Sequence, residues 1–557
     1  MKKIFLLLLA INTCAFAIKI PTSMINGIAD ERHEIHAFIH ANIFIDSKTQ
    51  QKDAVLLIKD NKVMNSGNNL QIPPQAIVHD VKGATIYPSF ILLDSDYGLS
   101  EVPKRAGFTF FGREIMDSTL DGAVNSNEAI KASYNALEDF KHDHKLAKKL
   151  RKNGFGVVLS SKHDGIMRGT SVLVDLHDEN EQQSILAQNA AFHLSFDKGS
   201  SKQLYPISLM GSSALIRQTW LDANWYNKAK PDFVDRDLQA VNNTEKLPQV
   251  FHVSNWQQSL LASKIALEHN KNIVIRTNGD SYKHLPTIKK LHKTLIVPLN
   301  FPQAIAINDE LDAWNTSLEK MMAWQSAPYN LYFLQENKIP FAIAPQVNGQ
   351  KDFLKNLRKA VKKGLSEEQA LAALTTQPAK ILKNPKIGNL RKDSIANFII
   401  VEGNIFQKDA SIAENWVAGH RYEINGLAKI ATGIYQLSQN NRIIKLKINN
   451  KDGKISVKEN NQTDDKQENK NKTTYKIKFN NNFATLTIKK GKNEQKLFGM
   501  INENGISNIV GKQPKWQLKK VAELTKQEQN KAEKNHSDNK DDTSNKDIIV
   551  KANLENP

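Results

Sequence analysis

An apolar segment that ends in two carboxylates constrains the fold of this chain more than any other feature. Residues 90–93 read Phe-Ile-Leu-Leu, and Asp94 and Asp96 come directly after them. A strand without polar alternation is typical of a parallel sheet that is covered on both faces. Side chains two residues apart on a strand point the same way, so we expect Asp94 and Asp96 to share one face at its carboxyl end. In a barrel of parallel strands, that end carries the chemistry.

The segments after this strand alternate between helix and strand patterns. Residues 128–150 have the spacing of an amphipathic helix, and residues 208–226 predict a second one. Further strands are expected at residues 156–160, 171–174, 249–253, 273–276, 295–299 and 341–344. Strands separated by helices of this length predict a parallel barrel. The expected fold class is therefore α/β, with a TIM-like (β/α)8 barrel over residues 87–384.

Short strands of alternating polarity lie on both sides of this region. They are expected before it at residues 37–45, 54–58 and 62–64, and after it at residues 396–401 and 415–422. Beyond residue 426, more alternating segments predict a separate antiparallel β module over residues 427–517. Residues 518–557 are rich in Lys, Glu, Asp and Asn, a composition that predicts a disordered tail.

The beginning of the chain has the parts of a secretory signal peptide in the required order. A charged start is followed by an apolar run and by Ala15-Phe16-Ala17, so we expect a signal peptide over residues 1–17. The only cysteine, Cys14, lies inside this leader, which leaves the mature chain without disulfides or thiolate chemistry. No later apolar run is long enough to cross a bilayer. We expect an exported protein, periplasmic or secreted after cleavage near Ala17, with no transmembrane segment.

The strand at residues 90–93 and the end of the barrel region resemble the amidohydrolase superfamily, in its imidazolonepropionase-like and prolidase-like branch. The family pattern Pro-Gly-Phe-Ile-Asp-x-His-x-His is matched by Pro88, Phe90 and Ile91, and Asp94 and Asp96 stand at its two His positions. Residues 364–380 resemble the last barrel helices, and residues 387–393 resemble the turn that follows them. The resemblance implies an exported member with altered metal ligands. It also implies that residues 36–86 and 385–425 form one composite β-sandwich beside the barrel.

The resemblance further implies where metal ligands are expected. Members of the family bind divalent metals at successive strand ends, and the metal activates water. Asp94 and Asp96 occupy the first His pair, and His252 stands where a middle-strand His is expected; a satisfied core histidine is the alternative for His252. Two carboxylates and one imidazole are a candidate set for one divalent ion, Zn2+, Mn2+ or Mg2+, and a metal-free site is the alternative.

Other polar residues are candidates for the pocket around this site. They follow later strands or lie in the turn-rich loop at residues 162–170: Asn278, Asp280, Gln346, His163 and Arg168. Gln346 stands where the resemblance places a metal-binding Asp, and turn chemistry explains His163 and Arg168 equally well. His142 and His144 imitate a His-x-His motif, but they fall on an expected helix, where side chains two apart diverge. We therefore interpret that pair as part of a solvated face. The sequence assigns no catalytic residue.

Two hypotheses of function follow. The first is an exported amidohydrolase-like hydrolase with a degraded metal centre, acting on a carbon–nitrogen bond of a small molecule, either non-peptide or in a cyclic amide. The alternative is a non-catalytic pseudoenzyme that binds a ligand or serves as the partner subunit of a separately encoded, metal-competent homologue. The net charge of +18 comes from dispersed lysines without a basic patch interleaved with aromatics, so nucleic acid is not an expected partner.

Overall fold

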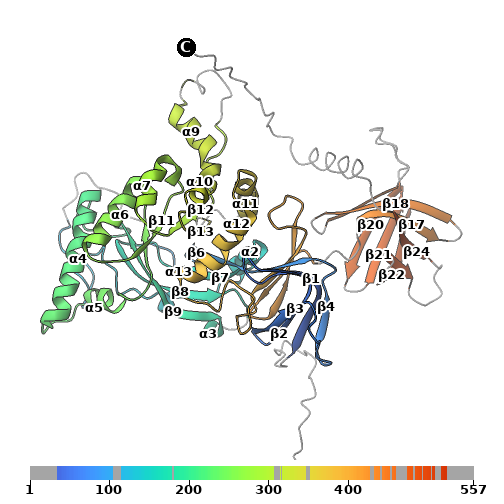
Figure 1. Ribbon diagram of the computed structural model, residues 1–557, viewed down its shortest axis with the longest axis horizontal. Helices are drawn as coiled ribbons and strands as arrows, with labels where there is room; N and C mark the ends of the chain where they lie inside the picture. The colour runs from blue at the N-terminus through green and yellow to red at the C-terminus, as the bar shows by residue number, and fades with distance from the viewer. Residues whose placement is uncertain are drawn as a thin grey trace, which may run out of the picture.

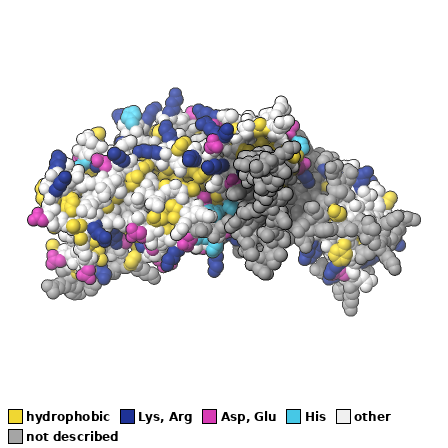
Figure 2. All heavy atoms as spheres, turned by 90° about the horizontal axis from the view of Figure 1, so that it is seen from below, with side chains coloured by type: hydrophobic (Ala, Val, Ile, Leu, Met, Phe, Trp, Pro, Cys, Tyr) yellow, Lys and Arg dark blue, Asp and Glu magenta, His cyan; other side chains and the backbone are white. Residues whose placement is uncertain are grey.

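The part of the chain that the computed structural model describes contains three eight-stranded sheets, and helices pack around one of them (Figure 1). This part comprises residues 34–103, 115–178, 181–305, 314, 316–345, 352–426, 432–439, 442–451, 454–459, 473–480, 483–491, 493–502, 505–508 and 516–522. The expected signal peptide lies outside the described residues. Within these ranges, no helix combines the length and the apolar character that a membrane crossing requires. Figure 2 shows Lys and Arg side chains spread over the visible face rather than gathered in one patch.

The central sheet has eight strands and is nearly closed into a barrel. In spatial order they are β6 (Phe90–Ser95), β7 (Phe155–Ser160), β8 (Met167–Asp175), β9 (Ile185–Ser195), β10 (Gln249–His252), β11 (Ile273–Arg276), β12 (Leu295–Pro298) and β13 (Phe341–Ala344). The first and last strands of this order, β6 and β13, also contact each other. All six residues of β6 are buried, which confirms the strand expected from its apolar run.

One strand of the barrel-like sheet runs against the others. β8 is antiparallel to both β7 and β9, while every other pair in the sheet is parallel. The expectation of a parallel barrel throughout is therefore wrong at β8. The reason is the short connection between β7 and β8, because a parallel crossover needs a dozen or more residues. The turn-rich loop at residues 161–166 allows only a reversal of direction.

Helices cover the outside of the barrel-like sheet (Figure 1). They are α1 (Ala136–Asp139), α2 (His144–Lys152), α3 (Glu181–Ser184), α4 (Leu209–Ala229), α5 (Arg236–Asn243), α6 (Trp256–Glu268), α7 (Leu285–Lys290), α9 (Leu318–Ser326), α10 (Asn330–Glu336), α11 (Phe353–Lys362), α12 (Glu367–Leu374) and α13 (Thr376–Ile381), with 3-10 turns η1 (Ser281–His284) and η2 (Ala327–Tyr329). The helix expected over residues 208–226 corresponds to α4, which Ser208 caps by accepting from the Gly211 N–H.

The single helix expected over residues 128–150 is wrong. Only α1 and α2 are helical there, and Phe140 between them is extended. The side chains of Asn135 and Asp143 each accept hydrogen bonds from the first turn of the helix that follows. Asx side chains favour such caps over helix interiors, so they divide the amphipathic pattern into two short helices.

Both ends of the barrel region contribute strands to a second sheet. Its order is β16 (His420–Glu423), β15 (Ser411–Val417), β14 (Phe398–Glu402), β5 (Thr85–Pro88), β1 (Ile35–Phe44), β2 (Gln50–Lys59) and β3 (Lys62–Gly67), and β4 (Ile77–Asp80) pairs with β1. We call it the composite sheet. It has its own hydrophobic core, which includes Phe38, Leu56 and Trp416. The Ser89 hydroxyl donates to Asn415, 326 residues further along the chain, at 3.0 Å.

The last sheet is a closed antiparallel barrel of eight strands. They are β17 (Gly433–Gln439), β18 (Arg442–Lys451), β19 (Lys454–Glu459), β20 (Thr473–Asn480), β21 (Phe483–Lys490), β22 (Asn493–Asn502), β23 (Gly505–Asn508) and β24 (Trp516–Ala522). β17 pairs with β24, so the sheet closes on itself. The alternating pattern predicted the antiparallel pairing. β24 extends past residue 517, the expected end of the module, because Leu518 fills the barrel core.

Candidate metal centre

Three polar side chains converge at the carboxyl ends of the central strands, a region we call the barrel mouth. Asp94 comes from β6, His163 from the loop after β7, and His252 is the last residue of β10. Each offers one ligand atom, and these three atoms all lie within 4.8 Å of one another. Asp94 and His252 are buried, while the side chain of His163 is 26% exposed. The group thus has one side open toward solvent.

Two atoms of this group are buried without a hydrogen-bond partner. Asp94 Oδ1 and His163 Nε2 lie 3.1 Å apart in an ion-pair contact, and neither atom has a hydrogen-bond partner among the described residues. Buried polar atoms are nearly always paired, so an unpaired couple that faces a third ligand calls for an explanation. An ion placed among the three side chains would satisfy both atoms. The donor set, one carboxylate and two imidazoles, is also one that transition metals accept.

The other oxygen of Asp94 is bound by a cation. Arg276, the last residue of β11, places Nε 2.7 Å and Nη2 2.6 Å from Asp94 Oδ2. Burial raises the pKa of Asp94, but the charges of Arg276 and His163 more than offset this and hold the pKa well below its usual range. Asp94 is therefore a carboxylate at neutral pH, with Oδ1 turned toward His163.

A second guanidinium lies beside the group. Arg168, on β8, is buried and donates from Nε to the Gly165 carbonyl at 3.0 Å. Burial lowers the pKa of Arg168 to about 10, although Asp197 and Asp94 raise it. It therefore remains charged at neutral pH, and the barrel mouth holds two buried or half-buried cations next to one carboxylate.

A third imidazole supports His252 from the interior. His193, on β9, places Nδ1 3.1 Å from His252 Nε2, and it is fully buried. Burial, reinforced by His163 and Arg168, lowers the pKa of His193 to about 3. Burial and Arg168 hold the pKa of His252 well below its usual range. Both rings are therefore neutral at neutral pH, which is the form that binds metals.

The loop that carries His163 is held in place by an ion pair. Asp164 accepts from Lys131 Nζ at 2.5 Å and from the Ser200 backbone N–H at 2.6 Å. Burial raises the pKa of Asp164, but Lys131 and Ser200 more than offset it, so its pKa is lowered. The loop backbone also pairs with its surroundings, because the Ser161 N–H donates to Ser95 O at 2.9 Å. His163 thus points toward Asp94 from an anchored loop.

Several residues predicted for the site lie elsewhere. Asp96 is exposed and is not part of the group, so the expectation that it shares a face with Asp94 is wrong. The reason is that β6 ends at Ser95, and residues 96–99 form a turn in which strand alternation no longer applies. Asn278 is exposed, and Asp280 accepts from the Trp256 N–H at the start of α6 at 3.1 Å. Gln346 lies outside the described residues.

Two residues of the site were missed or underrated by the sequence pattern. His163 was a pocket candidate only, although it lies three residues after the end of β7, next to the strand end that carries Asp94. His193 was not considered, although it lies near the end of the buried segment Ala190 to Ser195. A search for every His within three residues of a strand's carboxyl end would have found both.

Comparisons with known proteins agree with this architecture. No family model matches the chain, and no curated protein matches it. Among solved structures, an amidohydrolase from Thermotoga maritima MSB8 is similar with a TM-score of 0.56 and 20% identity, over 70% of this chain and 99% of that chain. A prolidase complexed with N-methylphosphonate-L-proline has a TM-score of 0.42 and 13% identity, over 70% of this chain and 99% of that chain. A beta-aspartyl dipeptidase from Fervidobacterium islandicum AW-1 has a TM-score of 0.40 and 14% identity, over 70% of this chain and 97% of that chain.

The first of these similarities bears on the fold. It extends over nearly the whole length of the Thermotoga maritima protein, so this chain shares the architecture of that amidohydrolase.

Proposed function

We propose that this chain is an exported hydrolase that cleaves a carbon–nitrogen bond, non-peptide or in a cyclic amide, of a small molecule. One divalent ion would be held by Asp94, His163 and His252. The observation that carries this proposal is the pair of unpaired buried atoms, Asp94 Oδ1 and His163 Nε2, which face each other beside the neutral ring of His252. The fold shared with an amidohydrolase supports the reaction class.

The three residues fit a catalytic rather than a structural ion. Catalytic sites keep three protein ligands and leave one position open, whereas structural sites use four. The partial exposure of His163 provides that open side. When bound, such an ion would polarise the substrate carbonyl and lower the pKa of a water molecule. Two imidazoles and one carboxylate favour Zn2+ or another transition ion over the Mg2+ that an Asp-Asp-His set would prefer.

The remaining side chains would orient the ligands and supply charge. Arg276 keeps Asp94 ionised and fixes Oδ2, which leaves Oδ1 available as a metal ligand. His193 holds the ring of His252 through the contact between their nitrogens. Arg168 and Arg276 add positive charge where amide hydrolysis develops a negative oxygen, and such charge is most effective in a site with little water.

The ion pair between Arg276 and Asp94 also favours a second candidate function. Arg276 already neutralises Asp94, and Arg168 adds another positive charge nearby, so the charge of a divalent ion is opposed. A barrel mouth of this kind would bind an anionic ligand without hydrolysing it. The chain would then be a non-catalytic subunit that pairs with a separately encoded amidohydrolase homologue.

Metal analysis and turnover distinguish the two. The mature protein is stripped with a chelator, titrated with Zn2+, Mn2+ and Co2+, and assayed on a panel of cyclic amides and N-acyl compounds. We expect metal-dependent release of product, and loss of both metal and activity in His163→Ala. The Asp96→Asn variant is the matched control, because its carboxylate lies outside the group. A protein that stays metal-free at the barrel mouth in excess of all three ions would contradict the hydrolase and support the binding subunit.

A further inference from the structure

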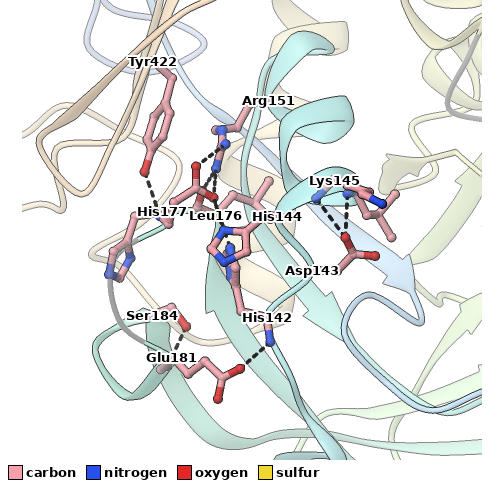
Figure 3. Close-up of polar contacts among 12 residues, drawn as sticks. His142, Asp143, His144, Lys145, Arg151, Leu176, His177, Glu181, Ser184 and Tyr422 are labelled. Atoms are coloured by element: carbon pink, nitrogen blue, oxygen red, sulfur yellow. Dashed lines mark hydrogen bonds and ion pairs between the residues drawn. The ribbon is translucent and has the colours of Figure 1, made fainter. Parts of the chain in front are cut away.

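A second cluster of metal-binding side chains lies away from the barrel mouth. His142 lies between α1 and α2, His144 is the first residue of α2, and Asp178 follows β8. His142 Nε2 and His144 Nδ1 lie 3.1 and 3.3 Å from the same atom, Asp178 Oδ1. The two imidazole rings are 4.4 Å apart and nearly perpendicular (Figure 3). Three potential ligands thus converge on one point.

This arrangement corrects the interpretation of His142 and His144 as diverging side chains on a helix. Asp143 is the cap of α2, with extended backbone angles of φ −106° and ψ 95°. Only His144 is therefore helical, and the rotation of 100° per residue does not separate it from His142. The cap places the two rings on the same side of the chain.

We propose that His142, His144 and Asp178 form a second site for a divalent transition ion such as Zn2+, Cu2+ or Ni2+. Their ligand atoms all lie within 4.8 Å of one another. Imidazole nitrogens suit these three ions, and one carboxylate completes a set of three protein ligands. The side chain of His144 is 69% exposed, so the site opens to solvent and leaves room for water as a further ligand.

The surroundings hold two of these ligands in position before an ion arrives. His142 Nδ1 lies 2.9 Å from the Tyr97 hydroxyl. This contact fixes the ring and leaves Nε2 as the metal ligand. A hydrogen bond at the second ring nitrogen is the usual support of a metal-binding histidine. Asp178 is fixed by Arg151 Nη2, which lies 2.6 Å from Oδ2, and its backbone N–H donates to the Tyr422 hydroxyl at 2.8 Å. Figure 3 shows Arg151 and Tyr422 beside the two imidazoles.

The charge of Arg151 sets the character of the site. Its Nη1 also lies 2.9 Å from Asp178 Oδ1, so a bound ion has to share that carboxylate with a guanidinium. Sharing the carboxylate lowers the affinity of the site for the ion. The site therefore exchanges its metal with the medium rather than holding it permanently. For an exported protein, such a site would respond to the supply of transition metal outside the cytoplasm.

Occupancy would also act on the structure around the site. The ion would connect α2 to the segment after β8, and Tyr422 extends this connection to β16 of the composite sheet. The guanidinium of Arg151 lies 3.8 Å from the centre of the Tyr422 ring, so these residues already form one contact between barrel and sheet. An ion that binds only the folded form stabilises it by mass action.

The test uses the full mature chain, stripped of metal. His144→Ala removes an exposed ligand, and Lys145→Ala, the next and also exposed residue of α2, is the matched control. Equilibrium dialysis with Zn2+ and electron paramagnetic resonance with Cu2+ count the ions and their nitrogen ligands. We expect His144→Ala to lose one bound ion, or to bind it at least tenfold more weakly, while Lys145→Ala behaves as the parent. A smaller Zn2+-dependent rise in melting temperature should accompany this change, because only the barrel mouth still binds the ion.

A replacement ligand separates metal binding from a merely structural role of His144. His144→Cys offers a thiolate at the same position and is expected to restore binding, with a sulfur-to-cobalt charge-transfer band when Co2+ is added. The barrel mouth does not contribute to this band, because the mature chain has no other cysteine. Equal stoichiometry and affinity in His144→Ala and Lys145→Ala, or a Cys variant without the band, would overturn the proposal.

Discussion

Arg276 binds Asp94 through two contacts to a single carboxylate oxygen, at 2.7 and 2.6 Å, although the two residues are 182 positions apart in the chain. The contact leaves the second oxygen of Asp94 facing His163 without a hydrogen bond. One side of the carboxylate is therefore used to keep it charged, and the other side is available for a ligand.

Removing the guanidinium should destabilise the protein strongly. Arg276→Gln leaves Asp94 as a buried charge without its main partner, and breaking such pairs costs about 3–5 kcal/mol of unfolding free energy. Denaturation in urea measures the change. Arg217→Gln is the control, because the Arg217–Glu268 pair is on the surface and should leave the midpoint nearly unchanged. Equal effects of the two substitutions would contradict the role given to Arg276.

The exposed carboxylate after β6 should be dispensable for metal binding. Asp96→Ala is expected to bind as many ions as the parent at the barrel mouth, because Asp96 lies outside the group of three ligands. Asp94→Ala, in contrast, should lose the ion. Atomic absorption on dialysed protein gives both counts. A loss of metal in Asp96→Ala would mean that the chain after Ser95 turns back toward the site.

The loop that presents His163 should be sensitive to one glycine. Gly199 has φ +63°, and a Cβ there would overlap with Asp164 Oδ1 and with the Gly165 backbone nitrogen. Gly199→Ala is therefore expected to shift the loop and to weaken metal binding at the barrel mouth at least severalfold, measured by calorimetric titration. Gly83→Ala is the matched control, since it has φ +80° and open space around it. It should cost only about 1–2 kcal/mol of backbone strain and leave metal affinity unchanged.

One imidazole in the composite sheet should contribute to a fall in stability in mild acid, in addition to His193 and His252. Burial, reinforced by His36, lowers the pKa of His79 to about 4, and its ring stacks on Phe38 with centroids 4.8 Å apart. The folded pKa lies below the unfolded value of about 6.5, so the unfolded state binds the proton first. Stability is thus complete above pH 6.5 and declines as the pH falls toward 4, by at most about 1.4 kcal/mol per pH unit.

Tryptophan fluorescence during urea unfolding at several pH values measures this slope. His79→Gln should make it less steep between pH 6.5 and 4, while His193 and His252 keep their own contributions. His40→Asn is the control, because His40 is exposed, and Asn tolerates its positive φ of 53°. An unchanged slope in His79→Gln would show that other groups dominate the acid response.

Local patterns in the sequence predicted the elements of this fold better than their mutual geometry. The apolar run of β6, the capped helix α4 and the strand ending in His252 were all predicted, because periodicity and caps are properties of neighbouring residues. The direction of β8 and the break between α1 and α2 were not, although a short loop and two Asx caps signalled them. The direction of a side chain at a strand end depends on where the hydrogen bonds of the strand stop. The prediction for Asp96 was wrong because β6 already ends at Ser95.

The partners of the site residues were beyond such patterns. Arg276 and His193 act on Asp94 and His252 from other strands, and nothing near them in the sequence indicates this contact. Burial then lowers the pKa values of His193 and His252, and burial is a property of the assembled barrel.

The pairing of β5 with β14 has a consequence for how the polypeptide acquires its shape. Ser89 can contact Asn415 only after 326 further residues have been synthesised. The edge of β5 that pairs with β14 therefore stays unpaired until then. The composite sheet therefore forms only after β14 and β15 have been made. Until then, a chaperone that shields the open edge would limit aggregation of the chain.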